Sequence, residues 1–165
     1  MVPYRPAFGE GAAPHPAAGH NAGMDLDAAL RYAQPITRGV LATVKADGRP
    51  QLSNIMFAIA ADGIIRISVT ATRAKTANIR RDPRVSLHVT ESDFWSYVVI
   101  EGDAELTPVA AATDDATVDE LVALYRDLQG EHPDWDEYRA AMVADARLVV
   151  RLRPSRAYGS LPQQG

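Results

Sequence analysis

Apolar and polar residues alternate along several short stretches of the chain, which is the pattern of half-buried β-strands. Three of these stretches come early, at residues 39–45, 51–60 and 64–70, and an Ala-Asp-Gly turn signal follows each of the first two. Tight turns with Asp-Gly join neighbouring antiparallel strands. The pattern therefore predicts a three-stranded antiparallel meander over residues 39–70.

Strand patterns return in the second half of the chain, at residues 84–91, 94–107 and 146–154. Gly102 interrupts the longest of them, and a glycine in such a place is typical of a β-bulge. Six short strands, mostly joined by hairpins, favour an antiparallel sheet. Closing that sheet into a small barrel removes its exposed edges, so we predict a mainly β fold of this kind with helices at its edges.

Apolar residues at helical spacing indicate four helices. The first lies within residues 24–36, with acidic residues in its first turn and Pro35 at its end. A short helix is expected within residues 73–83, closed by Pro83, and two more at residues 113–132 and 134–145. The chain shows no strand–helix alternation of the kind that builds a parallel sheet.

The first 23 residues differ in composition from the rest. They hold four of the 11 prolines and four of the 11 glycines, with almost no branched aliphatic side chains. Such a segment cannot bury enough apolar surface to offset its ordering entropy. We therefore predict a disordered tail over residues 1–23 and one folded domain over residues 24–165.

Composition excludes several kinds of chemistry. The chain has no cysteine, so disulfides, thiolate metal sites and cysteine nucleophiles are excluded, and its four histidines lack metal-ligand spacing. No apolar run approaches the roughly 20 residues of a membrane span, and the N-terminus lacks the apolar core of a signal peptide. We expect a cytoplasmic protein with no metal site and no membrane contact.

Positive charge gathers in residues 72–84, which hold five of the 17 Lys and Arg residues of a chain whose net charge is −4. Arg73 and Lys75 stand at the start of the short predicted helix, where backbone N–H groups favour an anion. The hydroxyls of Thr76 and Ser68 would add donors. A phosphate or carboxylate seat and a solvated helix end both fit this spacing.

Other basic residues of this stretch have a simpler interpretation. Arg80 and Arg81 lie one or two turns further along the helix, so we expect them to point to solvent or to pair with acids. A nucleic-acid surface is disfavoured, because the chain is acidic and the stretch has no interleaved aromatic residues.

Three segments together resemble the split-barrel flavin-binding superfamily of pyridoxamine 5'-phosphate oxidase. They are "GVLATVKADGRPQLSNI", "IIRISVTATRAKTANIRRDPRVSLHV" and "WSYVVIEGDAELT", and the likeness covers about residues 24–160. The closer match is the deazaflavin-dependent branch, oxidoreductases that use coenzyme F420. The resemblance implies a six-stranded antiparallel split β-barrel, a homodimer with the cofactor at its interface, and a small-molecule substrate.

The resemblance also implies site residues. It assigns Arg73, Lys75 and Thr76 to the cofactor phosphate, and Ser68 and Val69 to the groove beside it. Contacts to the ring system fall to four residues of one strand: Gln51, Leu52, Ser53 and Asn54. Trp95 would reach the site from the partner subunit, with barrel packing as its alternative role.

The sequence departs from the family pattern at two positions. Thr72 stands where close relatives often have proline before the arginine, and Ala77 stands where they often have a further base, which would weaken the grip on a polyanionic tail. FMN chemistry on the same fold and a non-catalytic deazaflavin-storage protein remain alternatives to F420-dependent hydride transfer. No catalytic residue is assigned; the candidates for a proton donor are Tyr97, Tyr158 and His88.

Overall fold

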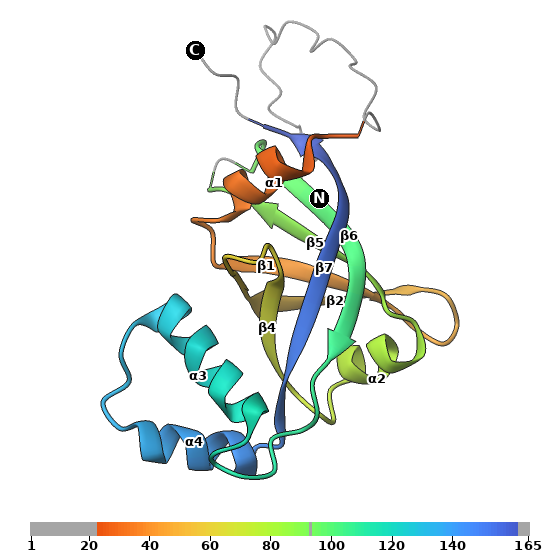
Figure 1. Ribbon diagram of the computed structural model, residues 1–165. Helices are drawn as coiled ribbons and strands as arrows, with labels where there is room; N and C mark the ends of the chain where they lie inside the picture. Colours follow the sequence, from red (N-terminus) through yellow and green to blue (C-terminus); the bar gives the residue numbers. More distant parts are fainter. Residues whose placement is uncertain (1–22, 93, 162–165) are drawn as a thin grey trace, which may run out of the picture.

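The computed structural model describes residues 23–92 and 94–161, and within them the strands form a single antiparallel sheet. The strands follow the order β2-β1-β5-β6-β7-β4-β3 across the sheet (Figure 1). Their bounds are β1 Arg38–Val44, β2 Pro50–Met56, β3 Ala58–Ile59, β4 Ile65–Thr70, β5 Arg84–Thr90, β6 Tyr97–Leu106 and β7 Arg147–Ser160. The mainly β fold with flanking helices confirms the predicted class.

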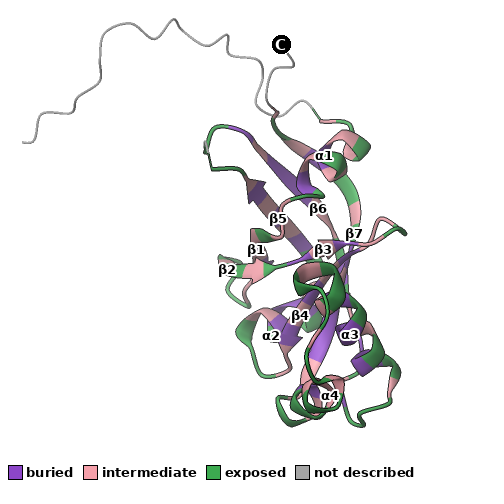
Figure 2. Ribbon diagram, turned by 90° about the vertical axis from the view of Figure 1, so that its left-hand side faces the viewer, coloured by how far each residue is buried: buried purple, intermediate pink, exposed green. Residues whose placement is uncertain are grey.

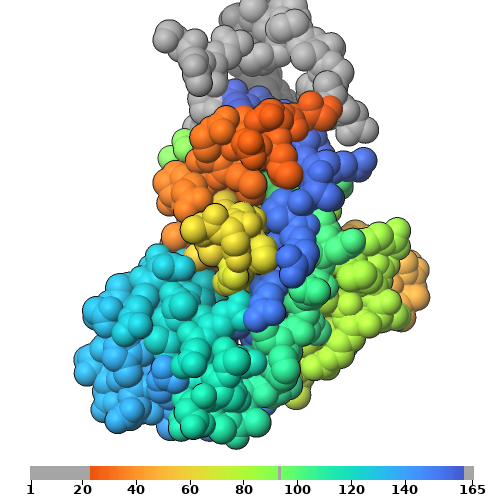
Figure 3. Space-filling view, in the orientation of Figure 1, coloured from red at the N-terminus to blue at the C-terminus, as the bar shows by residue number. Residues whose placement is uncertain are grey.

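Within the described residues, four helices lie around this sheet. Their bounds are α1 Leu26–Ala33, α2 Ala74–Arg81, α3 Ala116–Gln129 and α4 Trp135–Ala144. The space-filling view shows the α3–α4 hairpin, in cyan to light blue, as a lobe at the opposite end of the molecule from α1 (Figure 3). None of the described helices is long and apolar enough to cross a membrane.

The predicted meander over residues 39–70 is correct for its first two strands and wrong for the third. β1 and β2 pair along their whole length, but β4 pairs with β7 and, on its other side, only with the two residues of β3. The strand predicted at 51–60 breaks at Phe57, whose side chain is buried and whose N–H donates to the carbonyl oxygen of Thr37 at 3.0 Å. This break accounts for seven strands in the described residues where six were expected.

The break also curls the sheet. β2 and β3 follow each other in the chain yet lie at opposite ends of the strand order, so the sheet bends until its ends approach each other at Phe57. Buried positions alternate with more exposed ones along the strands (Figure 2). The inward positions carry branched aliphatic side chains that are fully buried, at about 1.5–3 kcal/mol each; they include Leu41, Ile65, Ile67, Leu87, Ile100, Leu148 and Leu152.

The last strand is longer than predicted and crosses a bulge. β7 continues to Ser160, although the pattern ended it at residue 154, and Pro154 lies within it. The β6–β7 register shifts between Glu101 and Gly102, which confirms the bulge expected at Gly102. A proline, which has no N–H to donate, is tolerated in a sheet at such an irregularity.

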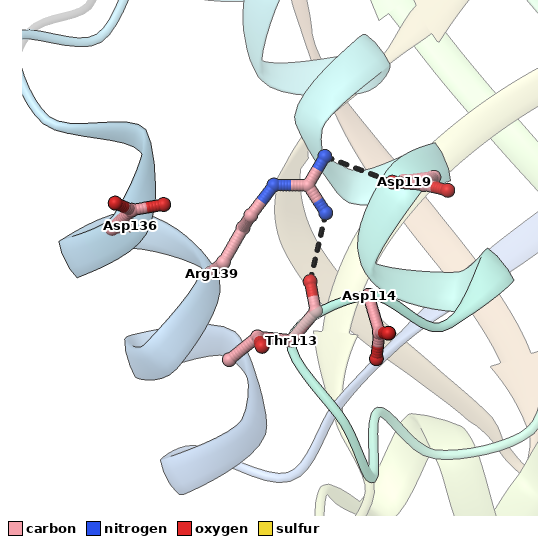
Figure 4. A pocket seen from close by; sticks show the side chains of 5 residues that line it. All are labelled: Thr113, Asp114, Asp119, Asp136 and Arg139. Atoms are coloured by element: carbon pink, nitrogen blue, oxygen red, sulfur yellow. Dashed lines mark hydrogen bonds and ion pairs between the residues drawn. The ribbon is translucent and has the colours of Figure 1, made fainter.

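One arginine links α4 to α3 and to the segment before it. Arg139 on α4 donates to the carbonyl oxygen of Thr113 at 2.8 Å and pairs with Asp119 on α3 at 2.8 Å, inside an acidic pocket that Asp114 and Asp136 also line (Figure 4). Arg139 already offsets part of the negative charge of these carboxylates. We therefore assign this pocket a structural role in joining the two helices. The described residues contain no group of three or more His, Cys, Asp or Glu placed to hold a metal ion.

The tail predicted over residues 1–23 lies outside the described residues, except for Gly23.

Candidate functional site

A pocket of about 450 Å³ opens between the curled sheet and the α3–α4 hairpin. This size is typical of small-molecule sites. We call it the hairpin pocket. It is lined by Asn54, Ile55 and Met56 of β2, Ser68 of β4, Lys75 of α2, Leu124, Tyr125, Leu128 and Gln129 of α3, Tyr138 and Met142 of α4, and Arg147 of β7.

The charges of the hairpin pocket are all of one sign. Lys75 and Arg147 line it, and no carboxylate does so among the residues that the structure describes. Burial lowers the pKa of Lys75 below its ordinary value of 10.5, and the nearby charge of Arg73 lowers it further. Because its surroundings disfavour the protonated amine, an anion placed beside Lys75 would relieve this cost.

Arg147 reaches the same pocket from the start of β7, opposite Thr70 of β4. Its Nη1 donates to the Ser68 hydroxyl at 3.4 Å, and its Nη2 lies 3.5 Å from a carboxylate oxygen of Asp145. Its Nε is buried, makes no hydrogen bond among the described residues, and lies 3.5 Å from the same carboxylate of Asp145. A guanidinium normally makes shorter bonds than these, so several of its donors are poorly used.

The hairpin supplies the apolar wall of the pocket. Tyr138 is fixed by donating its hydroxyl to the carbonyl oxygen of Leu121 at 3.1 Å, and burial raises the pKa of this phenol. The ring of Trp135 lies behind the wall, with its centroid 5.7 Å from those of both Tyr125 and Tyr138. A ligand in the pocket would therefore alter the surroundings of a tryptophan that it does not touch.

The structure gathers three of the predicted site residues in the hairpin pocket, namely Asn54, Ser68 and Lys75. Arg73 stands at the N-cap of α2, exposed, and close enough to influence Lys75. Thr76 is fully buried, and its hydroxyl donates to the carbonyl oxygen of Thr70 at 3.0 Å. The proton of that hydroxyl is already used within the fold.

The remaining predicted site residues do not line the hairpin pocket. Gln51 accepts a hydrogen bond from the buried amide of Asn78 at 2.7 Å, which ties β2 to α2. The side chain of Val69 belongs to the barrel core, and Ser53 is half-buried on β2. Leu52 and Trp95 are 66% and 81% exposed.

In the second half of the basic stretch, Arg80 and Arg81 are exposed as predicted, and Arg81 makes hydrogen bonds that the sequence did not indicate. Arg81 bonds to the carbonyl oxygen of Val44 and, at 3.2 Å, to the side-chain oxygen of Asn78. Arg81 is exposed, as expected, and its charge adds to the hydrogen bonds from Arg84 in lowering the pKa of Asp82, but its guanidinium also ties the end of α2 to β1. Arg84 does pair with an acid, Asp82, at 2.7 Å.

Arg147 and the hairpin wall were not among the predicted site residues. Arg147 lies 72 positions after Lys75, and only the pairing of β4 with β7 brings it beside Ser68. The wall belongs to helices whose apolar faces could equally be explained by packing against the core. The available sequence signal was a basic residue at the first position of a strand that directly follows a helix.

The free-energy cost of holding a charged, half-buried amine at Lys75 gives a test. Replacing Lys75 with methionine should raise the melting temperature of the ligand-free protein by about 1–3 °C, since functional sites trade stability for binding. The gain should be complete at pH 7. It should fade as the pH rises through the lowered pKa of Lys75 and vanish above about 10.5, where an unfolded lysine also loses its proton.

Thermal unfolding at several pH values measures this effect. The chain offers a matched control in its other lysine, Lys45, which is partly exposed and pairs with Asp47 at 3.4 Å. Lys45→Met should leave the melting temperature nearly unchanged. A Lys75→Met protein that melts lower than the parent at pH 7 would contradict the view that the charged amine of Lys75 destabilises the ligand-free protein.

The sequence profile of the family described as pyridoxamine 5'-phosphate oxidase matches residues 26–160, which is most of the chain. The chain belongs to the pyridoxamine 5'-phosphate oxidase family. This confirms the resemblance seen in the sequence.

Solved structures of similar proteins agree with the pyridoxamine 5'-phosphate oxidase fold. A conserved hypothetical protein, Rv2991, from Mycobacterium tuberculosis is 24% identical, with a TM-score of 0.64, over 86% of this chain and 91% of its own. A protein described as an F420 reductase is 28% identical, with a TM-score of 0.57, over 73% of this chain and 88% of its own. An FMN-binding relative from Nostoc punctiforme is 17% identical, with a TM-score of 0.52, over 79% of each chain.

Proposed function

We propose that this protein is an oxidoreductase that binds coenzyme F420 in the hairpin pocket and uses it to reduce a small organic molecule. The observation that carries the proposal is the composition of the pocket, with cations and a hydroxyl on one side and an apolar, aromatic wall on the other. A phosphorylated, flat, ring-bearing cofactor needs both. Family membership and the likeness to an F420 reductase support this choice.

Each side of the pocket has a distinct role in this proposal. Lys75 and Ser68 hold the phosphate, and Asn54 and Met56 on β2 meet the ring system. The α3–α4 wall excludes water from the reacting face, which strengthens polar contacts there and prevents side reactions. When bound, the deazaflavin supplies two-electron hydride chemistry, and the protein supplies binding and orientation.

FMN is the alternative cofactor. The FMN-binding relative shares the fold, and Ala77 leaves one base fewer on the first turns of α2 for a long anionic tail. A protein that binds the deazaflavin without turnover is the second alternative. Both alternatives place the cofactor in the same pocket. They predict different cofactor affinities or no turnover of substrate.

Titration separates these alternatives. Purified protein is titrated with F420 and with FMN while tryptophan fluorescence is recorded, since Trp135 lies behind the pocket wall. The proposal expects tighter binding of F420, followed by oxidation of the reduced cofactor with at least one member of a panel of enones and nitroaromatic compounds. Tighter binding of FMN would reject F420, and binding without turnover would favour storage.

We further propose that a second copy of the chain covers the outer face of the sheet. The strand register places Leu52 beside Ala42 and Val40 beside His88 on the face opposite to the core, and Leu52 is 66% exposed there. An apolar surface of this kind is typical of a subunit interface, and a twofold pair would cover it on both copies.

Replacing Leu52 with lysine tests this arrangement. Leu52 is largely exposed in the single chain, so the substitution should leave folding intact while burying a charge in the dimer. Sedimentation equilibrium should show a dimer for the parent and a monomer, or a dimer at least tenfold weaker, for Leu52→Lys. A monomeric parent would reject the interface.

A further inference from the structure

Arg147 has a chemical setting that its role in the fold does not explain. Its guanidinium lies at the edge of the hairpin pocket, and its buried Nε makes no hydrogen bond among the described residues, although it lies 3.5 Å from the carboxylate of Asp145. The hydrogen bonds of its two Nη atoms are long, at 3.4 Å to Ser68 and 3.5 Å to Asp145. The side chain is 32% exposed, so solvent and ligands can reach it.

We propose that Arg147 is the second cation of the phosphate seat and decides that the pocket takes phosphorylated ligands over their unphosphorylated rings. This inference rests on the proposed function, since it concerns the same pocket and ligand class. Lys75 comes from α2 and Arg147 from β7, and the Ser68 hydroxyl on β4 lies beside Arg147. A lysine gives a point charge and an arginine gives a planar fork, so together they suit an anion with several free oxygens.

Asp145 explains how the arginine is held without a ligand. Its carboxylate lies 3.5 Å from Arg147 and is 56% exposed, and it does not line the pocket. An exposed, long ion pair of this kind contributes little free energy. A phosphate can therefore replace Asp145 as the partner of Arg147 at small cost.

The neutral part of the ligand would be bound independently of Arg147. The apolar wall belongs to α3 and α4, with Leu124, Leu128 and Met142 among its residues. Removing the guanidinium should therefore weaken phosphorylated ligands and leave the bare ring almost unaffected. A purely structural role for Arg147 would weaken both to the same extent.

Two pairs of ligands test this inference by fluorescence titration of the full chain. FMN is compared with riboflavin, and F420 with its deazaflavin core that lacks the phosphate chain. The variant is Arg147→Gln, which keeps a polar side chain but removes the charge. The matched control is Arg153→Gln on the same strand, because Arg153 is exposed, pairs with Glu105 at 3.0 Å and lies outside the pocket.

We expect Arg147→Gln to weaken the tighter of the two phosphorylated ligands by about tenfold or more, as for a lost charge-assisted hydrogen bond. The matching bare ring should change less than twofold, and Arg153→Gln should change neither. An unchanged affinity for the phosphorylated ligand, or an equal loss for both members of the pair, would overturn the role of Arg147 and leave the proposed function standing. A parent protein that binds none of the four ligands would overturn both.

Discussion

Replacing Glu120 with alanine should lower the free energy of unfolding by about 2–3 kcal/mol, at the lower end for a largely buried ion pair that loses one partner. Glu120 lies on α3 and accepts hydrogen bonds from Arg66 of β4 at 2.8 Å and from Arg151 of β7 at 3.0 Å. Its side chain is only 12% exposed. Without it, two neighbouring arginines face each other with no shared counter-charge.

The loss should depend on pH in a defined direction. Burial by itself would raise the pKa of Glu120, but the hydrogen bonds from Arg151 and Arg66 outweigh burial and hold the pKa below its ordinary value of 4.5. A carboxylate with a lowered pKa stabilises the fold above its unfolded pKa and ceases to do so as the pH falls through the folded value. The difference between parent and variant should therefore be complete at pH 7 and shrink below about pH 4.5.

Urea unfolding at pH 7 and pH 4 measures this difference. Glu120→Gln is a useful companion, because the amide keeps the size and one acceptor and should lose less than alanine does. The same variants should also weaken ligand binding, since Glu120 anchors the helix that carries Leu124, Tyr125 and Leu128 into the hairpin pocket. A Glu120→Ala protein as stable as the parent at pH 7 would contradict this anchoring.

Replacing Gly102 with alanine should destabilise the protein by about 3 kcal/mol or more, at the severe end for single substitutions. A Cβ at this position would lie 1.9 Å from the carbonyl oxygen of Arg153 and 2.8 Å from its carbonyl carbon. Both are backbone atoms of β7, so relief requires the two longest strands to separate at their bulge. Strand backbone cannot yield as a flexible side chain does.

Soluble yield and thermal unfolding measure this effect. Gly23→Ala is the control, because a Cβ there meets nothing within 4 Å, and its stability should stay within about 0.5 kcal/mol of the parent. An alanine at position 102 that leaves the melting temperature unchanged would contradict the close contact between β6 and β7 at the bulge.

Local pattern was enough to predict much of the fold. The strands from Arg38 to Met56 and the bulge at Gly102 follow from alternation and turn residues, which act over a few positions. The break at Phe57 does not, because it depends on a side chain turning into a core whose other members lie far along the chain. Without that break, the pairing of β4 with β7 could not be anticipated.

The candidate site divides in the same way. Lys75 could be found from its place in a basic stretch at a predicted helix start, and Ser68 as a nearby hydroxyl donor that the family resemblance also indicates. Thr76 shares that stretch, yet its hydroxyl bonds to the backbone of Thr70, a contact that residue type alone does not predict. Arg147 needs the full sheet order, because β7 reaches β4 only after the chain has passed through β5, β6 and both hairpin helices.

A crystal structure of the protein grown with F420 tests the central claim most directly. We expect the phosphate within hydrogen-bonding distance of Lys75 and the ring between β2 and the wall formed by Tyr125 and Leu128. A ring bound elsewhere, such as the groove of about 740 Å³ on the outer face of the sheet that Arg84 and Arg156 line, would contradict it.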